Sequence, residues 1–404
     1  MKDIQGGVCA PLGFKAGGIH CGIRKNKSKK DLALIVSDVI CHAASTYTLN
    51  KVKGAPIAVT KQHLENGEAK AIICNSGNAN TCNPDGEEIA NAVCELCAGA
   101  LKIDVNDIIV ASTGVIGEPL PLTPFENHMT DLVNSLGYNN STDACEGIMT
   151  TDTVRKEYAV EFELDGKVCH IGAIAKGSGM IHPNMATMLA FVTTDVAISK
   201  DMLQEVIHEV VDDTFNMVSV DGDTSTNDML SIMANGLAEN NEIQTKNENY
   251  IIFKEALMYI CTCLSKGIAK DGEGATKLLT CTVNHANTIK DAKIVAKSVI
   301  TSSLFKAAMF GCDANWGRIL CAIGYCEADY DIDKIEVYLA NEVGSICVCQ
   351  NGRGYPFDEA EALKILSEDE IEIMIDLHDG HYQATAWGCD LTYDYVKING
   401  DYRT

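Results

Sequence analysis

The stretch that decides the fold is KGSGMIHPNMATMLAFVTT, residues Lys176 to Thr194. Its first half combines two glycines with Pro183, which has no amide donor, so a regular helix or strand cannot hold it. From Thr187 onward the residues are mostly apolar or β-branched and predict a strand. A hydroxyl side chain is therefore expected at the junction between an irregular loop and a strand.

The neighbouring sequence predicts a hairpin before this stretch and a helix after it. Asp165-Gly166 separates two strand-like runs, 158–164 and 167–174, and both positions of such a two-residue turn favour positive φ. Ser199 is placed as the N-cap of a helix. The apolar face of that helix comprises Met202, Leu203, Val206, Ile207, Val210 and Val211.

Strand-like and helical runs alternate along the rest of the chain, and we find no internal repeat. Strands are predicted at 32–37, 71–74 and 108–113, the last ending at Gly114, and a helix at 88–101. The polar run 239–249 reads as a surface loop. From about 291 to 404 strands with short turns dominate, including a hairpin at Asn351-Gly352 and alternation through 371–377, so a second lobe is expected there.

Composition narrows the class of protein. The chain has 404 residues, enough for two or three domains, and a formal net charge of −24. Such a charge repels nucleic acids and anionic lipid surfaces, so neither is expected as a partner. Neither an N-terminal export segment nor a membrane-spanning run is apparent, and a cytoplasmic location is expected. The 18 cysteines lie scattered in apolar runs and are interpreted as reduced and buried.

Three segments imitate binding motifs without the required spacing. Residues 221–232 open like a calcium loop but lack its glycine and its final glutamate. Residues 272–277 lack the Gly-Lys-Ser/Thr ending of a phosphate loop. Cys94 and Cys97 form a single CxxC within a helical pattern, so they are interpreted as packing residues and no metal is expected.

Two other segments follow strands and carry polar groups. Residues 74–80, Cys-Asn-Ser-Gly-Asn-Ala-Asn, precede a helix, where backbone amides can hold an anion. In Ser112-Thr113-Gly114, a hydroxyl and an amide could face one oxyanion. On the sequence alone, a tight strand-to-helix turn explains the first segment better than an anion site does, and an ordinary strand end explains the second better than an oxyanion site does.

Thr187 is the hydroxyl of greatest chemical interest. If the peptide bond between Ala186 and Thr187 were cut, Thr187 would carry a nucleophilic hydroxyl and an α-amine that could act as its base. Position alone does not require this, because many strands begin with threonine.

The combination of motifs resembles the ornithine acetyltransferase family of arginine biosynthesis, and the resemblance runs nearly end to end. Mild departures are Cys312, where arginine is common, and Ala314, where proline is usual before Asn-Trp-Gly-Arg. The runs that carry the resemblance are 6–7 to 18–20, 75–80, 111–117, 149–153, 176–191, 221–228, 272–277, 313–319 and 399–404.

The resemblance implies a fold, an assembly and a reaction. The fold is an αββα layered sandwich of the N-terminal-nucleophile type with a second α/β lobe. Self-cleavage between Ala186 and Thr187 gives an α chain, 1–186, and a β chain, 187–404, which assemble as a heterotetramer. Acetyl passes from N2-acetyl-L-ornithine to L-glutamate through acetyl-Thr187. No cofactor is implied, and acetyl-CoA use is left open because monofunctional and bifunctional members share these motifs.

The resemblance also assigns site residues. Thr187 is the nucleophile, and Thr113 with Gly114 forms the oxyanion hole. Lys176 could meet a substrate carboxylate and Glu273 a substrate cation. The positions that match the family's substrate-binding residues are Thr153, Lys176, Thr187, Glu273, Asn399 and Thr404.

Two alternatives remain from the sequence. A hydrolase or aminopeptidase with the same nucleophile would release acetate in preference to N-acetylglutamate. A non-catalytic protein that binds an anion or nucleotide at 75–80 would bind its ligand without cleavage at Thr187.

Overall fold

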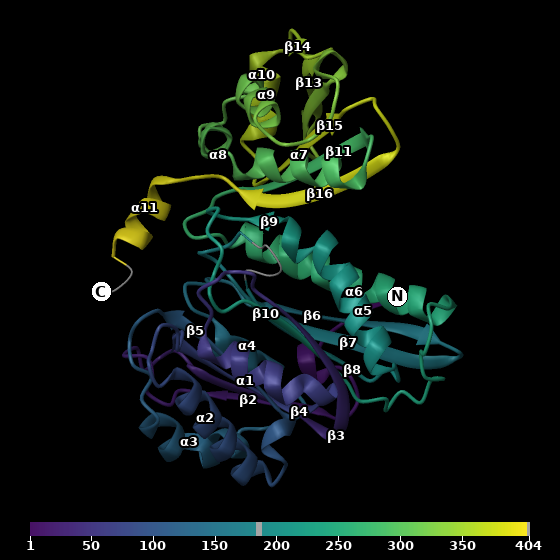
Figure 1. The fold of residues 1–404 in the computed structure, drawn as a ribbon. Coiled ribbons are helices and arrows are strands. Elements are labelled where there is room, and N and C mark those ends of the chain that lie inside the picture. The colour runs from purple at the N-terminus through teal and green to yellow at the C-terminus, as the bar shows by residue number, and fades with distance from the viewer. Residues whose placement is uncertain (183–187, 402–404) are drawn as a thin grey trace. The chain divides into compact units, whose positions relative to one another are not determined.

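The structure is a computed structural model that describes residues 1–182 and 188–401. These residues form two compact units (Figure 1). Unit 1 comprises residues 1–177, 188–216 and 224–264, and unit 2 comprises residues 178–182, 217–223 and 265–401. Helix α6 (Glu248–Lys270) begins in unit 1 and ends in unit 2.

One large sheet organises unit 1. Its strand order is β1-β6-β7-β8-β10-β3-β4-β5, and β2 pairs with the first half of β3 outside this path. The strands are β1 (Lys2–Ile4), β2 (Phe14–Ile19), β3 (Leu32–Tyr47), β4 (Glu68–Asn78), β5 (Ile108–Val115), β6 (Lys156–Leu164), β7 (Lys167–Lys176), β8 (Leu189–Thr194) and β10 (Met229–Ala234).

Strand β3 divides this sheet into two halves. Its first half pairs with β2 and β4 and its second half with β10, and the β4 register shifts between Val36 and Cys41. A single apolar cluster joins residues from both halves, including Ile72 of β4 and Phe191 of β8, together with helix α4. The two halves therefore share one core between them.

Helices cover the outer faces of both halves. A second cluster joins α2 and α3 to the opposite face of β3, β4 and β5. Helix α5 packs on β3, and Phe253 of α6 contacts Phe162 of β6 with ring centroids 6.5 Å apart (Figure 1). These layers confirm the predicted αββα sandwich. Besides α6, the α-helices described in this unit are α1 (Ala55–His63), α2 (Gly86–Leu101), α3 (Thr123–Asn134), α4 (Ser141–Ile148) and α5 (Lys200–Asp213).

Local signals in the sequence predicted several elements correctly. Asp165 and Gly166 have φ of 52° and 75° and join β6 to β7, as the hairpin prediction required. The Ser199 hydroxyl accepts a hydrogen bond from the Met202 amide at the start of α5. Cys94 and Cys97 lie buried in the core on α2, in agreement with a packing role.

Strand lengths were predicted less well. Strand β5 does not end at Gly114 but continues to Val115, because Gly114 pairs with Gly77 in the ladder. Strand β4 extends to Asn78, so most of the expected anion-binding turn at 74–80 is strand. Not all of the cysteines are buried: all 18 are free thiols, but Cys82 and Cys321 are exposed.

Unit 2 contains a second sheet with the order β14-β13-β12-β15-β11-β16-β9. The last continuous stretch of unit 2 begins at Ser265 and includes β11, and the unit also takes in residues 178–182 and 217–223, whereas the second lobe was expected from about 291. The elements are β9 (Val218–Ser219), β11 (Leu278–Ala286), β12 (Glu336–Ala340), β13 (Ser345–Gln350), β14 (Arg353–Gly354), β15 (Glu370–Asp376), β16 (Tyr382–Cys389), α7 (Ile289–Thr301), α8 (Ser303–Phe310), α9 (Trp316–Gly324), α10 (Glu359–Leu366) and α11 (Tyr393–Gly400).

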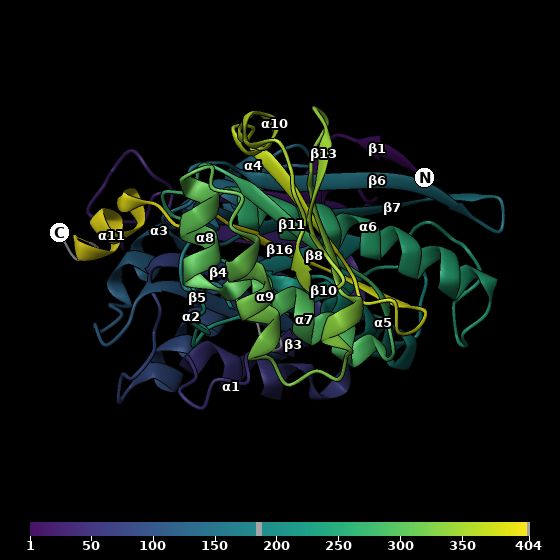
Figure 2. The same cartoon turned by 90° about the horizontal axis from the view of Figure 1, so that it is seen from above.

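Helices line the strands of unit 2. Helix α7 packs along β11 and β16, α8 and α9 pack beside α7, and α10 contacts β12 and β13 (Figure 2). Burial alternates along β15, so Ile371, Ile373 and Ile375 face the core as predicted. Asn351 and Gly352, at φ of 51° and 68°, form the predicted hairpin between β13 and β14. Within the described part of the chain, no helix is both long and apolar enough to cross a lipid bilayer.

Candidate active site

The parallel strands β4 and β5 end side by side, and Gly77 of β4 pairs there with Gly114 of β5. Gly114 has φ of 136°, and a Cβ on it would lie 2.3 Å from the Gly77 carbonyl carbon and 2.5 Å from the Asn78 nitrogen. Only glycine fits such a close approach of two backbones. Thr113, the next residue back on β5, is buried with 8% of its surface exposed.

Lys176 reaches this strand end from the last position of β7. Its Nζ lies 3.4 Å from the Thr113 Oγ1, although the two residues are 63 positions apart. Burial lowers the pKa of Lys176, and the carboxylate of Asp152 opposes part of that shift. The structure therefore brings Thr113, Gly114 and Lys176 together, while their roles in oxyanion and substrate binding stay predictions.

A buried ion pair supports this lysine. Lys156 Nζ lies 2.7 Å from Asp152 Oδ1, and both side chains are almost fully buried. The same carboxylate oxygen accepts a hydrogen bond from the Gly177 amide at 2.7 Å. Burial acts to raise the pKa of Asp152, but the charges of Lys156 and Lys176 and these hydrogen bonds outweigh it and hold the pKa well below the ordinary value.

Sequence reasoning did not single out Asp152 and Lys156. Their spacing of four residues gave no usable signal, because Asp152 lies in a loop and Lys156 begins β6. Thr153, which was predicted to bind substrate, is exposed beside the buried Asp152.

Asn227 fixes the end of β5 with its side-chain amide. Its Nδ2 donates to the carbonyls of Ala79 at 2.6 Å and Ser112 at 2.9 Å. Its Oδ1 accepts from the hydroxyls of Thr81 and Thr226, each at 2.6 Å. This asparagine was not predicted to have a role.

Asp228, the next residue, carries a buried carboxyl group with an unpartnered oxygen. Within the described residues its Oδ2 has no hydrogen-bond partner, and 2% of the residue surface is exposed. Burial raises its pKa well above the ordinary value, although a hydrogen bond from Ser225 and the charge of Lys176 act against the shift. A carboxyl group in this setting favours its protonated form.

Unit 2 contains two further residues that were predicted to bind substrate, Glu273 and Asn399. Asn399 Nδ2 donates to Glu273 Oε2 at 2.7 Å, and Glu273 is buried with 7% exposed. The Glu273 amide donates to the carbonyl of Ser178 at 3.1 Å. A Cβ on Gly179 would lie 2.3 Å from the Glu273 carboxyl carbon, so glycine there leaves room for the carboxylate.

Three of the predicted residues lie outside the described residues: Ala186, Thr187 and Thr404. The expected nucleophile and cleavage site therefore stay predictions. Lys176, Ser178 and Gly179, from the first half of the same sequence run, are described.

The asparagines of 75–80 serve the fold. Asn75 accepts from the Ser112 hydroxyl at 2.6 Å and donates to the Asn78 carbonyl at 3.0 Å. Asn78 donates to the carbonyl of Glu118, and Asn80 to that of Gly86. Backbone amides of the segment are engaged as well, because Ser76 donates to the Asp31 carbonyl, Ala79 to the Val115 carbonyl and Asn80 to Asn78 Oδ1. The anion-binding alternative therefore loses support.

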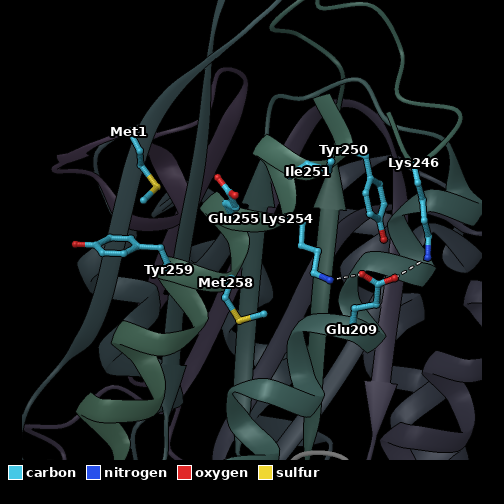
Figure 3. A pocket seen from close by; sticks show the side chains of 9 residues that line it. All are labelled: Met1, Glu209, Lys246, Tyr250, Ile251, Lys254, Glu255, Met258 and Tyr259. Carbon is cyan, nitrogen blue, oxygen red and sulfur yellow. Dashed lines mark hydrogen bonds and ion pairs between the residues drawn. The ribbon is translucent and has the colours of Figure 1, made fainter. Parts of the chain in front are cut away.

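A pocket of about 790 Å³ lies elsewhere on unit 1, against the outer surface of α5 and α6 (Figure 3). There Glu209 accepts hydrogen bonds from Lys246 at 2.7 Å and Lys254 at 2.5 Å. The described residues that line it include none of those predicted for catalysis.

The two facing sheet halves, their outer helices and the Thr113–Gly114 strand end define the class of protein: an αββα sandwich of the N-terminal-nucleophile type. Comparison with known proteins gives the family. The ArgJ family model matches residues 15–404. The arginine biosynthesis bifunctional protein ArgJ 1 of Clostridium acetobutylicum is 51% identical over 97% of this chain and 96% of its own. The chain belongs to the ArgJ family.

Solved structures include relatives. A crystal structure of the arginine biosynthesis bifunctional protein ArgJ from Bacillus halodurans has 45% sequence identity and a TM-score of 0.51, and the match covers 53% of this chain and 99% of that chain. A chain of ornithine acetyltransferase from Mycobacterium tuberculosis, crystallised with ornithine, has 35% identity and a TM-score of 0.42, with 46% of this chain and 99% of that one covered.

Proposed function

We propose that this protein is an acetyltransferase of arginine biosynthesis that moves acetyl from N2-acetyl-L-ornithine to L-glutamate. Its membership of the ArgJ family supports the reaction. The observation that carries the assignment to residues is the strand end at which Thr113, Gly114 and Lys176 meet.

Thr113 and Gly114 are proposed to stabilise the oxyanion that forms when the acetyl carbonyl is attacked. Lys176 Nζ can donate to the Thr113 oxygen, which turns the hydroxyl hydrogen of Thr113 away from the lysine and toward another acceptor. The close pairing with Gly77 fixes the peptide plane at Gly114. Donors held in place before the reaction stabilise developing negative charge without reorganisation.

Charged groups are proposed to recognise the substrates. Lys176 offers a buried cation to a carboxylate, and Glu273 offers an anion to an ammonium group. Asn399 donates to one carboxylate oxygen of Glu273 and so orients it. Thr153 and Thr404 are proposed as further substrate contacts.

Transfer is proposed to proceed by a ping-pong mechanism through Thr187. The Thr187 hydroxyl attacks the acetyl carbonyl of N-acetylornithine, and its proton passes through the Thr187 α-amine to the departing ornithine amine. The C–O bond forms first and gives a tetrahedral oxyanion, and collapse of that oxyanion breaks the C–N bond and leaves the acetyl ester. The neutral amine of glutamate then attacks the ester, which gives N-acetylglutamate and restores the hydroxyl.

The free α-amine is proposed to come from self-cleavage between Ala186 and Thr187. Attack of the Thr187 hydroxyl on the Ala186 carbonyl converts the amide to an ester, and water hydrolyses that ester. The solved Bacillus halodurans chain supports this step. The match covers 99% of that chain but only 53% of this one. A chain of about half length is what internal cleavage produces.

The same proposal includes four finer points, of which the assembly and the absence of a cofactor follow from the family resemblance. The α chain, 1–186, and the β chain, 187–404, assemble as a heterotetramer. The enzyme works in the cytoplasm and needs no cofactor. The word "bifunctional" in the names of the relatives favours acetyl-CoA as a second acetyl donor.

Mass spectrometry of the denatured, purified protein tests the cleavage. We expect two chains, of which the larger begins at Thr187, and we expect Thr187→Ala to stay at the full 43.5 kDa and to lack transfer. Thr245→Ala, at an exposed threonine, is the matched control and should cleave normally. An active wild-type protein that remains uncleaved would overturn the proposal, and release of acetate in place of N-acetylglutamate would favour a hydrolase.

A further inference from the structure

Two histidines and an aspartate meet in unit 2 where the parallel strands β11 and β15 end. His285 Nδ1 lies 2.7 Å from Asp376 Oδ2, and His378 Nδ1 lies 3.3 Å from Asp376 Oδ1. One ligand atom from each of the three residues lies within 4.8 Å of the other two. The imidazole rings stack at an interplanar angle of 13° with centroids 6.2 Å apart.

The backbone holds both histidines in place. The register of β11 against β16 shifts between Val283 and Ala286, which marks a bulge that contains His285. The Asp379 amide donates to the His285 carbonyl at 2.9 Å, and the φ angles of His285 and His378 are 52° and 48°. Bulges redirect side chains, and left-handed residues other than glycine persist only where their surroundings fix them.

A fourth group comes from the neighbouring strand β12. Glu336 pairs in register with Asp376, and its Oε2 lies 3.5 Å from His378 Nε2. Asp376 and Glu336 supply two negative charges next to two imidazoles. The histidine side chains are 56% and 46% exposed, so an ion and its water ligands can reach them.

Imidazole nitrogen with carboxylate oxygen is a donor set that suits Zn²⁺ and neighbouring divalent transition metals. A site with three protein ligands normally completes its coordination with water. A hydrogen-bonded carboxylate beside a ligating histidine orients the ring, which is the role that Glu336 can take.

We propose that His285, Asp376 and His378 bind one divalent transition-metal ion of the Zn²⁺ class. Glu336 either orients the His378 ring or binds the ion as a fourth ligand. The ion would tie together the ends of β11 and β15. This site is distinct from the residues proposed for acetyl transfer, so either proposal can fail without the other.

Titration of Zn²⁺ into the full-length protein, freed of metal with a chelator, tests this site by calorimetry. We expect one equivalent to bind in a manner that requires both histidines. His285→Gln and His378→Gln should each weaken binding at least about tenfold, since even outer partners of a metal site contribute 10–100-fold. His381→Gln is the matched control, because His381 is exposed in the same turn and belongs to no part of the cluster.

Thiols bind Zn²⁺ too, so the exposed Cys82 and Cys321 need a separate control. A Cys82→Ser/Cys321→Ser variant should keep the full equivalent, and Co²⁺ bound to wild type should show no thiolate charge-transfer band. Chelator-treated histidine variants should unfold at the wild-type urea concentration, which shows that they fold. The proposal would be overturned if His285→Gln and His378→Gln bound Zn²⁺ as tightly as the wild type and His381→Gln do. Loss of binding in the cysteine variant, or a thiolate band, would overturn it as well.

Discussion

Gly114→Ala tests the strand end at which the proposed oxyanion hole lies. The new methyl carbon would lie 2.3 Å from one backbone atom and 2.5 Å from another, and neither can rotate away. Overpacking typically costs about 1–3 kcal/mol. A residue with a side chain at φ of 136° adds strain of about 1–3 kcal/mol.

The free energy of unfolding should therefore fall by about 2–6 kcal/mol, a large part of the roughly 5–15 kcal/mol that a folded domain has. Any relief of the clash must move the Gly114 amide, so acetyl transfer should slow by about 10²–10³-fold, the usual effect of one lost oxyanion donor.

Urea unfolding and initial rates of N-acetylglutamate formation measure both effects. Gly99→Ala is the matched control, because Gly99 is exposed on α2 with open space around its Cβ position. That change should stabilise the protein by about 0.5–1 kcal/mol and leave the rate unchanged. Wild-type stability and wild-type rate in Gly114→Ala would refute the reasoning.

Three further substitutions probe the buried groups near this strand end. Lys156→Met leaves the buried Asp152 without its 2.7 Å partner, and the free energy of unfolding should fall by about 3–5 kcal/mol in urea; no change would mean that the pair is dispensable. Asn227→Ala removes four hydrogen bonds, and the free energy of unfolding should fall by about 2–6 kcal/mol. In the control Asn241→Ala, at an exposed asparagine, the free energy of unfolding should change by no more than about 0.5 kcal/mol. The pKa of Asp228 is raised in the folded state, so wild type loses stability as pH rises above the ordinary carboxyl range of about 4. Asp228→Asn has no such proton to lose, and its stability relative to wild type should increase between pH 4 and pH 7. A difference independent of pH would show that folding does not raise the pKa of Asp228.

Short-range signals predicted much of the fold. The Asp165-Gly166 and Asn351-Gly352 hairpins were recognised because a two-residue turn with positive φ is a property of the residues themselves. Strand β3 was predicted only over its first third, 32–37, because its course over 16 residues depends on which strands pair with each half. The αββα layering came from the family resemblance, since alternation of strands and helices alone indicates only a mixed α/β protein.

The candidate site, like the fold, was predicted from the sequence only in part. The Thr113 hydroxyl and the Gly114 backbone amide could be picked out from the sequence because they come at the end of a predicted strand, and the resemblance added Lys176 and Glu273. Asp152, Lys156 and Asn227 were missed because their role comes from burial and from partners distant in sequence.

Intact-mass analysis of the protein after incubation with N-acetylornithine, in the absence of glutamate, tests the central claim most directly. We predict that the chain beginning at Thr187 gains the mass of one acetyl group, that ornithine appears in a burst near one equivalent per site, and that added glutamate removes the adduct as N-acetylglutamate. If transfer proceeds while no adduct forms, and initial-rate plots intersect where a ping-pong mechanism requires parallel lines, acetyl passes directly between bound substrates and Thr187 is not its carrier.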